Sequence, residues 1–190
     1  RMSTAAWKRL AVCLGLATAA WFLYDMLIAG RNPALDAQSA ADRLFEDGAY
    51  ERALTLYRER NTIEPSNAFA LRGIALSLMQ LSHHNEALGA FAAAIDADPD
   101  DANAFANRGI LHDRMGNYAR AMVDYRQALS LDAEIADGPG WLTRFLRNQP
   151  DRPPSIADRL AYLEAEFDKP EAERVLRSPE IDAEQRPYQQ

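Results

Sequence analysis

Apolar and polar positions follow a helical period over residues 34–135, and the pattern itself repeats. Small and apolar residues return at the same offsets every 34 residues, so that 34–67, 68–101 and 102–135 align without an insertion. Apolar residues three and four apart share one face of a helix, and each unit has room for two such amphipathic helices. The pattern therefore predicts an all-α fold. The expected helices cover residues 34–47, 50–63, 68–81, 84–97, 102–115 and 118–131.

The third unit carries the repeat most clearly. Gly109 and Ala121 are small where its two helices are expected to cross, and Gly116 suits the turn between them. Tyr125 and Ala128 lie three residues apart on one face of the second helix. The two preceding units fill matching offsets with Ala41, Leu44, Gly48, Tyr50, Ala53, Tyr57 and Pro65, and with Leu71, Ala75, Leu78, Ala87, Phe91, Ala94 and Pro99; one departure is Arg60, which takes the position of Ala94 and Ala128.

This threefold pattern resembles the tetratricopeptide repeat (TPR), a helix–turn–helix unit of 34 residues. The resemblance implies a solenoid in which each unit buries its apolar face against its neighbours. It also implies a concave surface, lined by the first helix of each unit, that binds an extended peptide or a partner helix. By the family's positions, the residues of this groove are Gln38, Asp42, Phe45, Phe69, Arg72, Leu76, Met79, Asn103, Asn107, Ile110, Asp113 and Arg114.

The expected groove is mixed in character. Leu76, Met79 and Ile110 are expected to form an apolar strip, with Arg72 and Arg114 at its sides. Because arginine can bind a carboxylate through two hydrogen bonds, we expect an apolar peptide or helix that carries an acidic group. The alternative is that the chain's own C-terminal region covers these residues, since the last repeat of a solenoid needs a cap.

One subclass of the family clamps the C-terminal carboxylate of a chaperone peptide with basic and asparagine side chains. The corresponding positions here hold Gln38, Asp42, Gly73, Asn103 and Asn107. Only Asn107 offers a suitable polar group, and Asp42 would repel a carboxylate. We therefore do not expect the chaperone clamp.

The first thirty residues indicate a membrane anchor. Residues 10–29 contain one charged residue, Asp25, and about twenty apolar residues are needed to span a bilayer. Ala11, Gly15 and Ala19 recur every fourth residue, a spacing that lets another membrane helix approach closely. Basic residues before the span predict a cytoplasmic N-terminus and a periplasmic repeat array in a bacterial inner membrane. The alternative is a signal peptide cleaved after Ala19, which would release a soluble periplasmic adaptor.

The C-terminal part is expected to close the array. Residues 138–177 predict capping and amphipathic helices, and residues 178–190 predict an extended tail. Ser155 and Asp158 resemble a capping box at the start of one helix of about three turns. Such a helix is marginal alone, so its apolar stripe must be buried by the repeat array or by a partner. The stripe consists of Ile156, Leu160, Leu163 and Phe167, with Arg159, Glu164 and Glu166 off it.

Charge and motifs narrow the function. The whole chain has a net charge of −7, and residues 1–30 contribute three basic residues and one acidic residue, which leaves −9 for residues 31–190. This charge repels phosphates and argues against nucleic-acid binding. Adjacent His83 and His84 fall at a turn without other ligands at metal-binding spacing, and no catalytic motif is present. We therefore expect no enzymatic activity and no cofactor.

These observations lead to one functional hypothesis. The chain is expected to be a protein–protein interaction scaffold anchored in a membrane, which acts as an accessory subunit or assembly factor of a membrane protein complex. Its partners would be membrane or membrane-associated proteins, bound through the groove, the membrane helix and the C-terminal segment. Among its basic residues only Lys8 and Lys169 are lysines, and this preference for arginine indicates a GC-rich bacterial genome.

Overall fold

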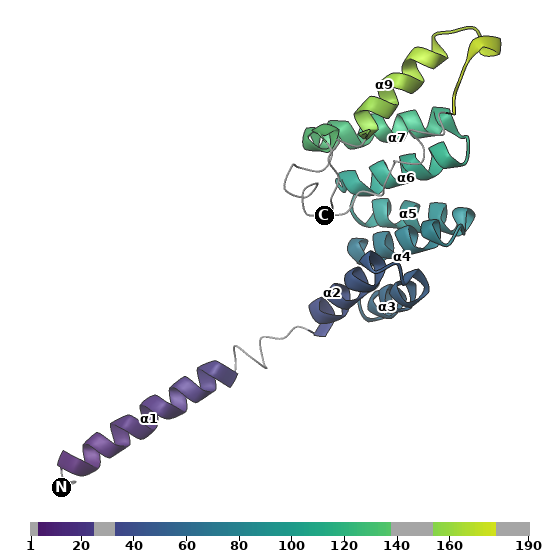
Figure 1. The fold of residues 1–190 in the computed structure, drawn as a ribbon. Coiled ribbons are helices and arrows are strands. Elements are labelled where there is room, and N and C mark those ends of the chain that lie inside the picture. The colour runs from purple at the N-terminus through teal and green to yellow at the C-terminus, as the bar shows by residue number, and fades with distance from the viewer. Residues whose placement is uncertain (1–3, 25–32, 138–153, 178–190) are drawn as a thin grey trace.

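The computed structural model describes residues 4–24, 33–137 and 154–177, and all regular secondary structure in these residues is helical (Figure 1). Each helix of the repeat array begins and ends within one residue of its expected range. The elements are α1 (Thr4–Tyr24), α2 (Pro33–Glu46), α3 (Tyr50–Ile63), α4 (Ala68–Gln80), α5 (His84–Ala97), α6 (Ala102–Arg114), α7 (Tyr118–Leu131), the 3-10 helix η2 (Ala133–Asp137), α9 (Ile156–Phe167) and the 3-10 helix η3 (Glu171–Glu173).

The array is a stack of helical hairpins. Within residues 33–131 the pairs α2–α3, α4–α5 and α6–α7 each form one hairpin, and the second helix of each hairpin packs on the first helix of the next. The first helices α2, α4 and α6 also contact one another in sequence. They form a common surface, which we call the first-helix face. Figure 1 shows the hairpins following one another along a single axis.

Glycines allow the helices to approach closely. A Cβ on Gly109 would lie 2.7 Å from Cδ1 and Cε1 of Tyr125, on the facing helix of the same hairpin. A Cβ on Gly73 would collide in the same way with the ring of Tyr57, across two hairpins. Both tyrosines are buried, so the missing side chains of the glycines make room for large rings in the core.

The helix α9 closes the end of the stack. Its capping box is present, because the hydroxyl of Ser155 accepts a hydrogen bond from the backbone N–H of Asp158 and the carboxylate of Asp158 accepts one from the backbone N–H of Ser155. The predicted stripe packs on the array rather than standing free: Ile156, Leu160 and Leu163 are buried in one cluster with Ile110 and Tyr125. The chain itself therefore supplies the cap that the last repeat needs.

A buried ion pair fixes the position of α9. Arg159 donates from Nε to Asp113 Oδ2 at 2.7 Å and from Nη2 to Asp113 Oδ1 at 2.8 Å. The two side chains are 1% and 3% exposed. The Tyr125 hydroxyl also donates to Asp113 Oδ2, and Arg159 Nη2 donates to the Leu176 carbonyl. Arg159 therefore belongs to the core, although it lies off the apolar stripe.

The N-terminal helix requires a correction. In α1, Lys8 and Arg9 lie inside the helix, and the apolar stretch from Leu10 to its end at Tyr24 is fifteen residues, short of the about twenty that a bilayer requires. Among the residues that the structure describes, no helix is both long and apolar enough to cross a membrane. This finding overturns the expected membrane span and the predicted localisation in a bacterial inner membrane.

The remaining expectations for this region concern packing. Ala11, Gly15 and Ala19 all lie in α1, and a Cβ on Gly15 would have no neighbour within 4 Å. None of the described helices therefore packs on α1 at Gly15, and α1 stands apart from the array in Figure 1. Residues 25–29 of the expected span, the start of the expected capping region at 138–153 and the expected extended tail at 178–190 lie outside the described residues.

The ion pair of α9 gives a first prediction. Arg159→Met keeps most of the buried volume but leaves the carboxylate of Asp113 without its cation, and it should lower the free energy of unfolding by about 3 kcal/mol. Arg159→Met combined with Asp113→Leu should recover much of that loss, because no buried charge then remains. Urea denaturation followed by circular dichroism measures both variants.

The control is an exposed ion pair that also joins α9 to the last hairpin, α6–α7. Arg126 on α7 and Glu164 on α9 are 53% and 45% exposed, and their contact is 2.8 Å. Arg126→Met should change the free energy of unfolding by less than about 1 kcal/mol. Equal losses in Arg126→Met and Arg159→Met would contradict the special role of the buried pair.

The close packing of the hairpins gives a second prediction. Gly109→Ala should destabilise the chain by about 1–3 kcal/mol, because the new methyl group would collide with Tyr125. Gly89 lies in the middle of α5 with no atom within 4 Å of its Cβ position. Gly89→Ala should therefore raise stability by up to about 1 kcal/mol through better helix propensity. The idea fails if both alanines shift the urea midpoint in the same direction.

Candidate binding pocket

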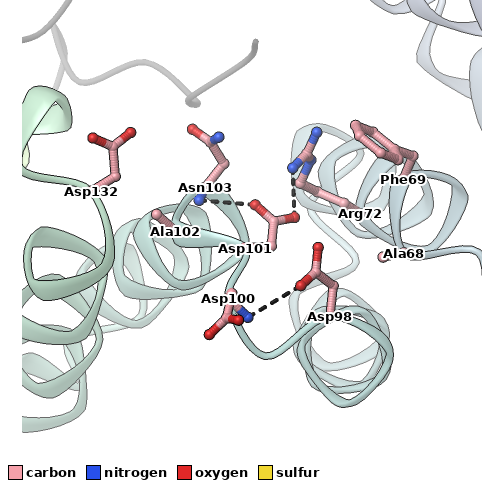
Figure 2. Close-up of a pocket in the computed structure, with 9 residues that line it drawn as sticks. All are labelled: Ala68, Phe69, Arg72, Asp98, Asp100, Asp101, Ala102, Asn103 and Asp132. Atoms are coloured by element: carbon pink, nitrogen blue, oxygen red, sulfur yellow. Dashed lines mark hydrogen bonds and ion pairs between the residues drawn. The ribbon is translucent and has the colours of Figure 1, made fainter.

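A pocket of about 220 Å³ opens at the edge of the first-helix face, beside the N-terminal ends of α4 and α6 (Figure 2). The loop between α5 and α6 and the end of α7 complete its walls. Three of the expected groove residues, Phe69, Arg72 and Asn103, meet here. The full lining is Ala68, Phe69, Arg72, Asp98, Asp100, Asp101, Ala102, Asn103 and Asp132.

Helix caps set the positions of these side chains. Asn67 begins α4 by accepting a hydrogen bond from the backbone N–H of Ala70 at 2.9 Å. Asp101 begins α6 in the same way, and its Oδ1 accepts from the backbone N–H of Asn103 at 3.0 Å and of Ala104 at 3.2 Å. Because side-chain caps fix the first turn of a helix, residues 69, 72 and 103 are held at defined places around the pocket.

Arg72 is already paired within the chain. Its Nη1 donates to Asp101 Oδ2 at 2.5 Å, and both side chains are mostly buried. Its guanidinium also lies 5.0 Å from the centre of the Phe69 ring. This contact ties the second hairpin to the third and balances the positive charge of Arg72. The expected use of Arg72 for a partner carboxylate would therefore require breaking an internal ion pair.

The remaining charge of the pocket is negative. Asp98, Asp100 and Asp132 make no salt bridge within the described part of the chain. Asp98 Oδ1 accepts from the backbone N–H of Asp100, and Asp132 Oδ1 accepts from that of Glu134. Four carboxylates and one guanidinium leave the nine lining residues with a net charge of −3.

The other groove positions lie elsewhere. Asp42 accepts a hydrogen bond of 2.6 Å from the hydroxyl of Tyr57, and Asn107 donates to the carbonyl of Asn103 at 2.8 Å. Arg114 is exposed at the end of α6, and Gln38 lies in α2. The side chains of the expected apolar strip, Leu76, Met79 and Ile110, are buried, and so is the groove residue Phe45.

The negative charge of the pocket was not predicted, although the sequence contains a pattern that indicates it. Residues 96–101 contain four aspartates, and none of them is among the expected groove residues. Glu64, Asp98 and Asp132 are each 34 residues apart, so an acidic residue returns at the end of the second helix of every unit. A comparison of equivalent positions would have found this recurrence.

Two other polar residues of the array lie outside the pocket. Burial, together with the hydrogen bond to Asp42, raises the pKa of Tyr57, so its hydroxyl stays protonated and can donate. His112 is 7% exposed and its Nδ1 has no hydrogen-bond partner in the described chain. Burial lowers the pKa of His112, which keeps the imidazole neutral.

Within the described residues no group of three or more His, Cys, Asp or Glu is placed to hold a metal.

Comparisons with known sequences match two parts of the chain to family models. The tetratricopeptide repeat family model matches residues 102–134, and the model of anaphase-promoting complex, cyclosome, subunit 3 matches residues 14–94. The protein SGT1 homolog of Oryza sativa subsp. japonica is 28% identical over 130 residues. The match takes in 68% of this chain and 34% of the rice protein, so the chain spans about a third of that relative's length.

Solved structures agree on the architecture. The second TPR of Spaghetti (RPAP3), bound to HSP90 peptide SRMEEVD, has a TM-score of 0.50 at 26% identity, over 52% of this chain and 92% of that chain. The first TPR of the same protein, bound to the same peptide, has a TM-score of 0.51 at 21% identity, over 67% and 93%. Because the identity to the first TPR is only 21%, that similarity shows the fold alone.

The helical array is therefore a TPR-like solenoid. The expected bacterial origin and membrane partners find no support in these comparisons.

His112 gives a prediction on pH. Because its pKa in the folded chain lies below its ordinary value, the unfolded chain binds the proton more readily, and stability falls as the pH drops below about 6.5. We expect His112→Leu to lose less stability than the unchanged chain between about pH 8 and about pH 5.5. Urea midpoints at the two pH values give the comparison, with His84→Gln as the control for loss of an imidazole. Identical pH dependence in His112→Leu and the unchanged chain would refute the prediction.

Proposed function

We propose that the chain acts as a protein-interaction scaffold whose pocket beside α4 and α6 receives a peptide segment of a partner protein. The observation that carries this proposal is the meeting of Phe69, Arg72 and Asn103 at one hollow of the first-helix face. Through this contact the chain would serve as an accessory subunit or assembly factor of a protein complex. The TPR domains of Spaghetti (RPAP3) support the peptide class of ligand, because they are bound to a short peptide.

Phe69 is the residue best suited to anchor such a segment. It is 53% exposed at the mouth of the pocket, whereas Leu76 and Met79 further along α4 are buried. Exposed aromatic residues beside a hollow commonly contribute much of the binding free energy at protein interfaces. A peptide that covered the ring would bury apolar surface without any rearrangement of the core.

The test is a selection of peptide binders with the full chain as bait. A displayed library of random peptides should yield binders, and Phe69→Ala should weaken their binding about tenfold by fluorescence anisotropy. Val123 provides the control, because it is an exposed apolar residue on α7 that does not line the pocket. Val123→Ala should leave the affinity unchanged. Recovery of no binders, or binders indifferent to Phe69→Ala, would sink the proposal.

A further inference from the structure

We propose that the pocket receives a positively charged side chain, an arginine or a lysine of the partner peptide. This inference rests on the proposed function and specifies the chemistry of its ligand. It differs from the acidic ligand expected from the sequence, because that expectation treated Arg72 as available for a carboxylate.

The fixed charges of the pocket favour a cation. Arg72 is the sole cationic residue of the lining, and Asp101 balances it at 2.5 Å. Asp98 and Asp132 line the pocket and have no basic partner in the described chain. An incoming guanidinium or ammonium group would therefore meet carboxylates whose charge is not yet compensated.

The helix ends add to this preference. Asp98 and Asp132 are the C-cap residues of α5 and α7, so the negative ends of two helix dipoles lie at the pocket. The N-terminal ends of α4 and α6 would attract anions, but the side chains of Asn67 and Asp101 already accept hydrogen bonds from their first N–H groups. The C-terminal ends of α5 and α7 therefore add negative potential at the pocket, while the caps occupy part of the N–H groups at the other two ends.

Asn103 is an independent indication of a polar ligand. The residue is 5% exposed and lines the pocket, yet its side-chain amide has no hydrogen-bond partner among the described residues. In Figure 2 this amide, the Asp132 carboxylate and the Phe69 ring point to the same side. The amide atoms of Asn103 are not among the fully buried polar atoms that lack a partner, so they are reached from the pocket. The amide oxygen can therefore accept a hydrogen bond from a guanidinium or ammonium N–H of a ligand.

The walls also fit the stem of such a side chain. Arginine and lysine carry three or four methylene groups below their charge, and these prefer apolar surface. Phe69 offers a half-exposed ring at the mouth of the pocket. The peptide SRMEEVD that is bound to the Spaghetti (RPAP3) domains contains three acidic residues, and the carboxylates of this pocket would repel it.

The experiment uses the full chain and three fluorescein-labelled peptides at low ionic strength. One peptide alternates arginine and alanine, one replaces each arginine by uncharged citrulline of the same shape, and one is SRMEEVD. Fluorescence anisotropy should show binding of the arginine peptide, binding about tenfold weaker for the citrulline peptide, and none for SRMEEVD.

Variants locate the effect. Asp98→Asn combined with Asp132→Asn should raise the Kd of the arginine peptide about tenfold and leave that of the citrulline peptide unchanged. Asp47→Asn combined with Glu51→Gln is the matched control, because both residues are exposed near the opposite end of the hairpins and the same two charges are removed. This control should bind the arginine peptide as the unchanged chain does.

The outcomes separate this inference from the proposed function. Equal affinity for the arginine and citrulline peptides, or equal weakening by the pocket and control variants, overturns the inference. If library selection still yields binders that depend on Phe69, the proposed function stands while the preference for a cation fails. If neither the library nor any of the three peptides binds, the proposed function fails and the inference with it.

Discussion

The contact between Arg159 and Asp113 determines how the repeat array ends. Each hairpin of the solenoid buries one apolar face against the next, so the last hairpin, α6–α7, needs a surface that the repeat itself does not supply. The apolar stripe of α9 supplies the area. A stripe alone would allow the helix to rotate or slide, whereas a buried guanidinium with two hydrogen bonds to one carboxylate has a single geometry. The ion pair therefore fixes the orientation of the cap.

At the pocket, the side chain of Asp101 has two structural roles. Asp101 caps α6 through one carboxylate oxygen and binds Arg72 of the preceding hairpin through the other. One side chain thus starts a helix and joins two hairpins. In doing so it removes Arg72 from any role as a free cation. This contact determines that the net charge of the pocket is negative, because the charged groups that remain on its walls are carboxylates.

The helices could be predicted closely from the sequence, whereas the character of the surfaces could not. Periodicity reports which residues share a helix face, and it placed the array helices within one residue and the stripe of α9 correctly. It does not report pairings between distant residues, such as Arg72 with Asp101 or Arg159 with Asp113. The first pairing gives Arg72 a partner within the chain, and the second buries a residue that lies off the apolar stripe of α9. The expected membrane span included apolar residues beyond Tyr24, where α1 ends.

The uncompensated negative charge of the pocket is related to one departure in the repeat. An acidic residue ends the second helix of each unit, at Glu64, Asp98 and Asp132. In the first unit Arg60 replaces the alanine found at 94 and 128, and it binds Glu64 at 2.5 Å. Ala94 and Ala128 offer no such partner, so Asp98 and Asp132 keep their charge. A single substitution of arginine for alanine in the repeat therefore neutralises the first of these sites and leaves the negative charge between the second and third hairpins.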